Sequence, residues 1–184
     1  MCAWVKPTDT AGGWRWIVAY GTGGAPFGRA MFIGMDGPIV NGGAYGSDLT
    51  VGSFWEPDTW KHVCLTYNGA VARLYGNGLL KKTKILSWDL ELGMAYLGRQ
   101  VHLSAPEVWK GAIDDVRIYN KALTAEEVLN VYNGLSSEGE SVPADESKTG
   151  ESPLTIDLSK PRVLDYCPKC LSACPNAEVG ATFN

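Results

Sequence analysis

The sequence contains no apolar run that approaches the ~20 residues needed to span a bilayer. Its first residues, MCAWVKP, lack the basic and then apolar pattern of a secretory signal peptide. Basic residues are in deficit, with 16 Lys and Arg against 20 Asp and Glu, and a net charge of −4 gives no basic footprint for nucleic acid. The sequence therefore predicts neither membrane insertion nor a nucleic-acid partner.

Motifs for nucleophilic catalysis and phosphate binding are also lacking. The two histidines, His62 and His102, accompany no Gly-x-Ser-x-Gly elbow. The glycine-rich run at residues 21–24 lacks the Gly-Lys-Ser/Thr ending of a phosphate-binding loop and follows an antiparallel-looking strand. We interpret this run as a loop, and we place His62 on a sheet face beside Trp60.

Short runs of apolar, aromatic and β-branched residues, separated by Gly, Asn, Asp and Pro, fill residues 1–134. This alternation is typical of a many-stranded antiparallel fold. The predicted strands lie at residues 3–5, 14–20, 30–34, 62–67, 71–75, 92–98 and 111–119. The fold class that this pattern indicates is all-β.

Two Asn-Gly pairs predict tight turns. Asn68-Gly69 follows the strand at residues 62–67, and Asn77-Gly78 follows the strand at residues 71–75. Asn and Gly tolerate the positive φ that such turns require. We therefore expect a three-stranded meander, with its third strand beginning near Leu79.

One short helix is predicted at residues 125–133. Thr124 with Glu127 forms a capping box, and the next apolar residues recur at helical spacing. Gly134 can end the helix in a left-handed conformation.

Four segments resemble, in order and spacing, the bacterial laminin G-like, concanavalin A-like jelly-roll family. They read WKHVCLTYNG, LYGNG, LGR and GAIDDVRIYNKAL, at residues 60–69, 74–78, 97–99 and 111–123. The resemblance covers roughly Ala3 to Gly134. It implies a two-sheet antiparallel β-sandwich with one short C-terminal helix, an extracellular or cell-surface location, and a role as an accessory module in larger proteins.

Family members usually begin with another strand and an Asp-Gly loop before the segment that reads MCAWVKP here. We therefore expect the laminin G-like domain, residues 1–134, to be N-terminally truncated, and an edge strand to be left unpaired.

Residues 135–153 are rich in Ser, Glu, Gly, Pro, Asp and Lys, which predicts a flexible linker. Residues 154–184 are too few for a second core and form a tail of unknown structure. Its cysteines, Cys167, Cys170 and Cys174, provide three thiolates where a zinc or iron–sulfur site requires four ligands. We interpret this region as an unstructured or incomplete tail that could form disulfides after export.

The other two cysteines, Cys2 and Cys64, lie in strand-like segments. We expect them to be small buried hydrophobic residues, with a bridge between neighbouring strands as the alternative.

A carbohydrate site would depend on exposed aromatic rings, which stack on the C–H faces of sugars. Trp14, Trp55 and Trp109 stand beside glycine, proline or charge near loops and are the candidates. The alternative is that they belong to the core, the place that we assign to Trp4, Trp60 and Trp88 as core or strand-end residues.

Calcium is the cofactor that the resemblance implies, because many laminin G-like modules bind Ca²⁺ through carboxylates and carbonyls at one rim. Asp114 is the candidate ligand, since strand alternation points it away from the inner face. Pairing with Arg117 or Lys110 is the alternative.

We therefore predict a non-catalytic module that binds a polysaccharide, another glycan or a surface protein. The alternatives are a structural spacer and a glycoside hydrolase. A hydrolase needs two close carboxylates, and Asp89 and Glu91 would share a strand face. The laminarinase-type hydrolases that this pair would resemble need a further glutamate shortly downstream, and residues 92–95 provide none.

Overall fold

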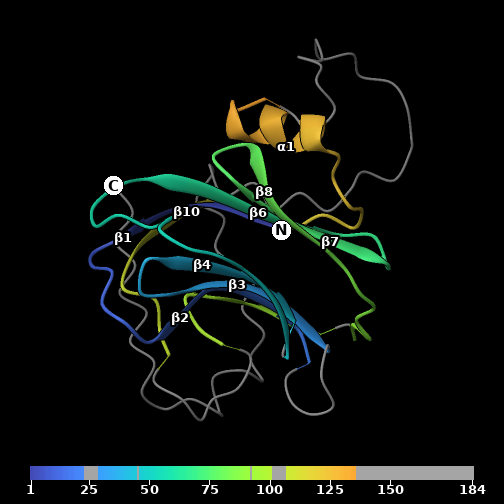
Figure 1. Cartoon of the computed structure of the whole chain (residues 1–184), viewed down its shortest axis with the longest axis horizontal. Coiled ribbons are helices and arrows are strands. Elements are labelled where there is room, and N and C mark those ends of the chain that lie inside the picture. Colours follow the sequence, from blue (N-terminus) through green and yellow to red (C-terminus); the bar gives the residue numbers. More distant parts are fainter. Residues whose placement is uncertain (23–28, 45, 92, 101–106, 136–184) are drawn as a thin grey trace, which may run out of the picture.

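The computed structural model describes residues 1–22, 29–44, 46–91, 93–100 and 107–135. These residues form two stacked antiparallel sheets of five strands each, with one helix outside them (Figure 1). The predicted two-sheet sandwich is thereby confirmed. The predicted linker beyond residue 135, the tail at 154–184 with Cys167, Cys170 and Cys174, and His102 lie outside the described residues.

The first sheet, called sheet A here, has the strand order β10-β1-β6-β7-β8. Its strands are β1 (Cys2–Pro7), β6 (Lys61–Tyr67), β7 (Val71–Gly76), β8 (Leu79–Ile85) and β10 (Gly111–Arg117). Strand β1 lies between β10 and β6, so both of its edges are paired. The expected N-terminal truncation, with loss of a strand that family members have before the MCAWVKP segment, stays a prediction.

The second sheet, called sheet B, has the order β5-β4-β3-β2-β9. Its strands are β2 (Trp14–Gly21), β3 (Ala30–Asp36), β4 (Ile39–Ala44), β5 (Ser47–Val51) and β9 (Met94–Leu97). Strands β4 and β5 were not predicted, because the run Asn41-Gly42-Gly43 looks like a loop. Gly42 is needed in a strand here, since a Cβ at this position would lie 2.8 Å from Leu74 Cδ1 on the facing sheet.

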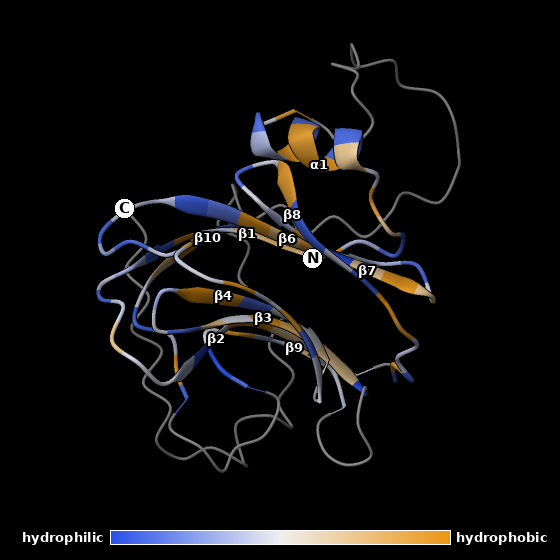
Figure 2. Ribbon diagram, in the orientation of Figure 1, coloured by the Kyte–Doolittle hydropathy of each residue, from blue (hydrophilic) through white to orange (hydrophobic). Residues whose placement is uncertain are grey.

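The main core lies between the sheets. Ile17, Ile33 and Leu49 from sheet B meet Leu65 and Leu74 from sheet A, and all five are fully buried. The facing strands contain many of the hydrophobic residues (Figure 2). This burial of apolar surface is the main stabilising term of the sandwich.

Both predicted Asn-Gly turns are present. Asn77 and Gly78 have φ of 51° and 76°, so β7 and β8 are joined by a two-residue turn of type I′. The β6–β7 turn is one residue longer. Asn68 Oδ1 accepts from the backbone N–H of Ala70 and Val71, and Gly69 has φ 94°.

A β-bulge interrupts β10 at Asp115. Cys2 pairs with Arg117 and Trp4 with Asp114, so two residues of β10 stand opposite Ala3, and Asp115 has φ 44°. The bulge shifts the alternation of side chains by one residue. Ile113 and Val116, three positions apart, therefore both pack on the core.

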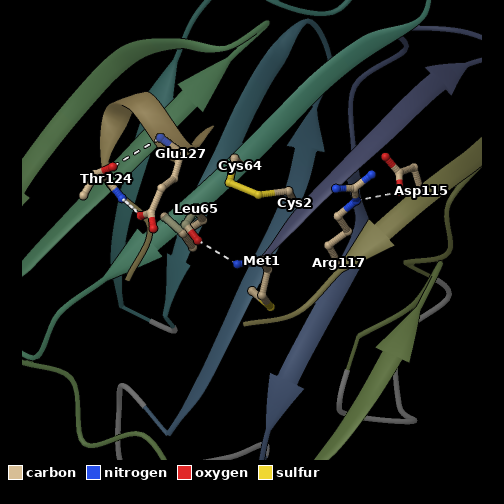
Figure 3. Close-up of a disulfide and its surroundings, with 8 residues drawn as sticks. All are labelled: Met1, Cys2, Cys64, Leu65, Asp115, Arg117, Thr124 and Glu127. Atoms are coloured by element: carbon tan, nitrogen blue, oxygen red, sulfur yellow. Dashed lines mark hydrogen bonds and ion pairs between the residues drawn. A yellow bond between two sulfur atoms is a disulfide. The ribbon is translucent and has the colours of Figure 1, made fainter. Parts of the chain in front are cut away.

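Helix α1 (Ala125–Tyr132) covers the outer face of sheet A. The predicted capping box is confirmed, since Glu127 N–H donates to Thr124 Oγ1 and Thr124 N–H donates to Glu127 (Figure 3). Gly134 has φ 75°, and Gly134 and Leu135 donate to the carbonyls of Val131 and Asn130, as in a Schellman motif. No helix in the described ranges is long and apolar enough to cross a membrane.

A disulfide between Cys2 and Cys64 lies beneath α1 (Figure 3). The two cysteines are register partners on β1 and β6, and both are 0% exposed. They pack with Tyr75, Val128 and Val131 in a second, smaller core. The structure therefore contains the alternative that the sequence left open for these cysteines, a bridge between neighbouring strands.

Candidate functional site

The outer face of sheet B, on the side away from the core, combines aromatic rings with polar groups that have no hydrogen-bond partner in the described ranges. Strand pairing brings Tyr96, Ala19, Phe32, Gly43 and Asp48 into one row across all five strands. Register partners point to the same face of a sheet. The neighbouring row contains Trp16, Gly34, Asn41 and Thr50.

Two glycines let larger side chains lie flat across this face. A Cβ on Gly34 would lie 3.3 Å from the Trp16 ring, and a Cβ on Gly43 would lie 3.1 Å from Asp48 Oδ1. The Trp16 ring thus extends over β3, and the Asp48 carboxylate extends over β4. Because Gly34 and Gly43 have no Cβ, the Trp16 and Asp48 side chains can lie toward the middle of the face.

Asn41 and Asp48 each supply a buried polar atom to this face. Asn41 is 1% exposed, and its Nδ2 has no partner among the described residues; the same is true of Asp48 Oδ1. Burial raises the pKa of Asp48, and the nearby Lys84 charge opposes this increase. Unpaired buried polar groups are costly, and such groups in a folded protein commonly bind water or a ligand.

An aromatic stack borders these polar groups. The Trp16 ring meets Phe32 edge-on at 4.3 Å and stacks on Trp14 at 5.6 Å with an interplanar angle of 14°. Trp16 is buried, whereas Trp14 is 37% exposed and forms the open end of the stack. We call Trp14, Trp16, Phe32, Asn41, Asp48 and Tyr96 the sheet B outer face.

Charged residues surround the sheet B outer face. The Trp16 indole N–H donates to Glu107 at 2.6 Å, and the Arg99 guanidinium lies 5.3 Å from the centre of the Tyr96 ring. Arg29 pairs with Glu91 at 3.2 Å, and Thr22 Oγ1 donates to Glu91 at 2.5 Å. Aromatic rings beside donors and acceptors are the groups that recognise sugars, because each sugar ring has C–H faces and hydroxyl edges.

The structure brings two of the three predicted sugar-binding tryptophans, Trp55 and Trp109, into contact with each other, and places Trp14 elsewhere. Trp14 belongs to the sheet B outer face, whereas Trp55 is 3% exposed and contributes to the core. The interpretation of Trp55 as an exposed ring is wrong, because its ring is packed edge-on against Phe54 at 4.7 Å and Trp109 at 6.0 Å. Trp109 is half-buried, and its indole N–H donates to the carbonyl of Ala112 at 3.3 Å.

The other tryptophans divide in a similar way. Trp88 is buried in the core as predicted, while Trp60 stands just before β6, is 41% exposed and has Lys6 Nζ over its ring. Trp4 stacks on Tyr132 of α1. His62 lies beside Trp4, at 5.5 Å, and Tyr132, at 5.7 Å, because His62 and Trp4 are register partners.

Asp114 is exposed and lies opposite Trp4 on β1. Its Oδ1 accepts from the backbone N–H of Asp115, and Arg117 pairs with Asp115 at 2.8 Å rather than with Asp114. Within the described part of the chain, no group of three or more His, Cys, Asp or Glu side chains could hold a metal ion. The assignment of Asp114 as a calcium ligand stays a prediction.

Asp89 and Glu91 do not share a strand face, because both precede β9 and lie in irregular chain. Asp89 is exposed, and Glu91 is engaged by Arg29 and Thr22. The paired-carboxylate arrangement considered for a hydrolase is therefore not formed by these two residues.

Comparison of solved structures finds the same fold in proteins of low sequence identity. The CBM40 module of a Ruminococcus gnavus IT-sialidase, bound to α2,3 sialyllactose, is 15% identical with a TM-score of 0.57, over 71% of this chain and 80% of that module. A leech intramolecular trans-sialidase is 16% identical with a TM-score of 0.58, over 78% of this chain and 24% of the enzyme. A candidate carbohydrate binding protein from Bacteroides ovatus is 19% identical with a TM-score of 0.55, over 70% of this chain and 38% of that protein.

The chain thus spans less than two fifths of the leech and Bacteroides ovatus proteins. None of the curated proteins compared with the chain matches it. A family model described as the concanavalin A-like lectin/glucanases superfamily matches residues 1–129. The chain therefore belongs to this superfamily and to its laminin G-like family.

Proposed function

We propose that the chain is a non-catalytic, lectin-like module that binds a glycan on the sheet B outer face. The observation that supports this most strongly is the amide nitrogen of Asn41 and the carboxylate oxygen Oδ1 of Asp48, which have no hydrogen-bond partner in the described part of the chain and lie beside the Trp14–Trp16–Phe32 stack. A sugar could stack on Trp14 and exchange hydrogen bonds with Asn41 Nδ2 and Asp48 Oδ1 once the neighbouring groups that bury these two atoms shift aside. The sialyllactose complex of the similar CBM40 module supports a glycan ligand for this fold.

An extracellular or cell-surface location fits this function. A buried disulfide persists in oxidising compartments, and Cys2–Cys64 is such a bond. A surface-protein partner and a structural calcium ion held in part by Asp114 are further proposals.

The test is a binding titration of the full chain against a panel of oligosaccharides. Trp14→Ala and Asn41→Ala should each weaken binding at least tenfold, because they remove the exposed ring and the free amide. Trp60→Ala is the matched control, since Trp60 is 41% exposed, close to the 37% of Trp14, but lies beside sheet A. Cooperative folding with no binding to any glycan would instead favour a structural or protein-binding spacer.

A further inference from the structure

Carboxylates predominate around the polar part of the sheet B outer face. Asp48 lies over β4, Glu107 accepts from Trp16, and Asp36 is the register partner of Trp14. None of the three forms a salt bridge within the described residues. Asp36 Oδ1 accepts from the backbone N–H of Gly13 at 2.8 Å, which leaves its negative charge uncompensated.

Lys84 is the basic group near Asp48, and two arginines beside the face are paired or distant from Asp48. The Arg29 guanidinium is paired with Glu91, and Arg99 lies on Tyr96 at the opposite end of the row from Asp48. Four strand spacings separate Tyr96 from Asp48, which is about 19 Å. Lys84 Nζ contacts the backbone carbonyl of Asp48 at 3.4 Å and forms no salt bridge with the carboxylate, so its charge offsets that of Asp48 only in part.

Asn41 and Asp48 form a donor and acceptor pair suited to a hydroxyl group. Asn41 is the register partner of Thr50, and Asp48 lies two residues before Thr50 on the same face, so Asn41 and Asp48 are diagonal neighbours about 7 Å apart. A sugar hydroxyl can donate to a carboxylate while it accepts from an amide. A sugar carboxylate at neutral pH has no proton to donate, and it would place a second negative charge beside the desolvated Asp48.

We infer that the sheet B outer face selects neutral, hydroxyl-bearing glycans and rejects glycans that carry a carboxylate near Asn41 and Asp48. This inference rests on the proposed glycan-binding function and names its ligand class. It differs from the ligand of the similar CBM40 module, since the sialic acid of sialyllactose carries a carboxylate. An identity of 15% to that module shows only that the fold is shared, so the charge of the sheet B outer face is read from the residues of this chain.

The experiment compares neutral glycans with acidic counterparts of the same backbone. The probes are lactose with 3′-sialyllactose and xylo-oligosaccharides with and without glucuronic acid, added to the oligosaccharide panel and titrated into the full chain at pH 7. The neutral member of at least one pair should bind, and its acidic counterpart should bind at least tenfold more weakly. Equal or tighter binding of the acidic member would overturn the inference while leaving glycan binding established.

Charge-neutralising variants separate electrostatic rejection from steric rejection. Asp48→Asn and Asp36→Asn keep the side-chain shape and should each narrow the ratio of neutral to acidic affinity at least threefold. Asp114→Asn makes the same charge change on sheet A and should leave the ratio unchanged. An unchanged ratio in both Asp48→Asn and Asp36→Asn would contradict the inference. Binding of no glycan in any pair or in the wider panel would overturn the proposed function itself.

Discussion

The indole nitrogen of Trp16 donates a 2.6 Å hydrogen bond to the carboxylate of Glu107, although 91 positions separate the two residues in the sequence. The bond fixes the ring at the centre of the aromatic stack to the segment that leads into β10. Because Trp16 is 4% exposed, loss of the acceptor would leave a buried N–H without a partner.

Glu107→Ala should therefore lower the free energy of unfolding by about 1–3 kcal/mol, the usual cost of an unsatisfied buried donor. Glu107→Gln keeps an acceptor oxygen and should lose less. Urea denaturation of the two variants measures this difference, and equal stability of both variants and the wild type would show that the bond contributes nothing.

Substitutions of Trp14 and Trp55 should affect different properties, glycan binding in the first case and stability in the second. Trp14→Ala removes an exposed ring, so it should weaken glycan binding with a small effect on the melting temperature. Trp55→Ala should cost about 3–5 kcal/mol of unfolding free energy, because it leaves a cavity in the core. Calorimetric melting and binding titrations on both variants check this division, and a stability loss confined to Trp14→Ala would reverse the assignment.

The Cys2–Cys64 disulfide closes a long segment of chain, with a sequence separation of 62. Replacing both cysteines by alanine should lower the unfolding free energy by about 2–4 kcal/mol. Mass spectrometry of protein alkylated without reduction should find neither Cys2 nor Cys64 alkylated. Free Cys2 and Cys64 in the folded protein, or an unfolding curve that the double substitution leaves unchanged, would refute the stabilising bond.

His62 should make the protein less stable in acid. Burial lowers the pKa of His62 to about 4 against the opposing effect of the Asp115 charge, and the unfolded value is 6.5. Between these values the unfolded chain binds a proton that the folded chain does not, so stability falls as the pH drops from about 6.5 to about 4. The total loss from this residue is about 3 kcal/mol.

Unfolding free energies of the wild type and His62→Leu, measured across this pH range, isolate the effect. The Leu variant should show the shallower decline, since it has no group to protonate at this position. Parallel curves of unfolding free energy against pH for the two proteins would mean that His62 does not contribute to the loss of stability in acid.

Asp114 tests the calcium proposal. If its carboxylate helps to hold Ca²⁺, millimolar calcium should raise the melting temperature of the wild type, and Asp114→Ala should reduce that increase. Chelator-treated protein is the reference for both. An increase of the same size in the variant would remove Asp114 from the set of ligands.

Local signals in the sequence predicted local structure well. The Asn77-Gly78 turn and the capped helix depend on residues within a few positions of one another, and both formed as expected. The glycine-rich strand β4 was missed because its glycines are explained by distant contacts: Gly42 packs against Leu74 of the other sheet, and Gly43 packs against Asp48 of β5.

The candidate site was harder to predict for the same reason. Trp14 could be found as an exposed aromatic residue, but Asn41 and Asp48 become neighbours through the pairing of β4 with β5. Their importance follows from burial without a partner, which no spacing in the sequence reveals. Trp55 was misassigned because proline and charge beside it suggested a loop, while its ring turns into the core.

The most direct test of glycan binding on the sheet B outer face is the melting temperature of the full chain with and without each glycan of a broad panel. A ligand that binds the native state raises the melting temperature by mass action. We predict an increase with at least one neutral glycan for the wild type, and a much smaller increase for Asn41→Ala, whose own cooperative transition reports that it folds. No increase with any glycan, or the same increase in Asn41→Ala, would contradict the account.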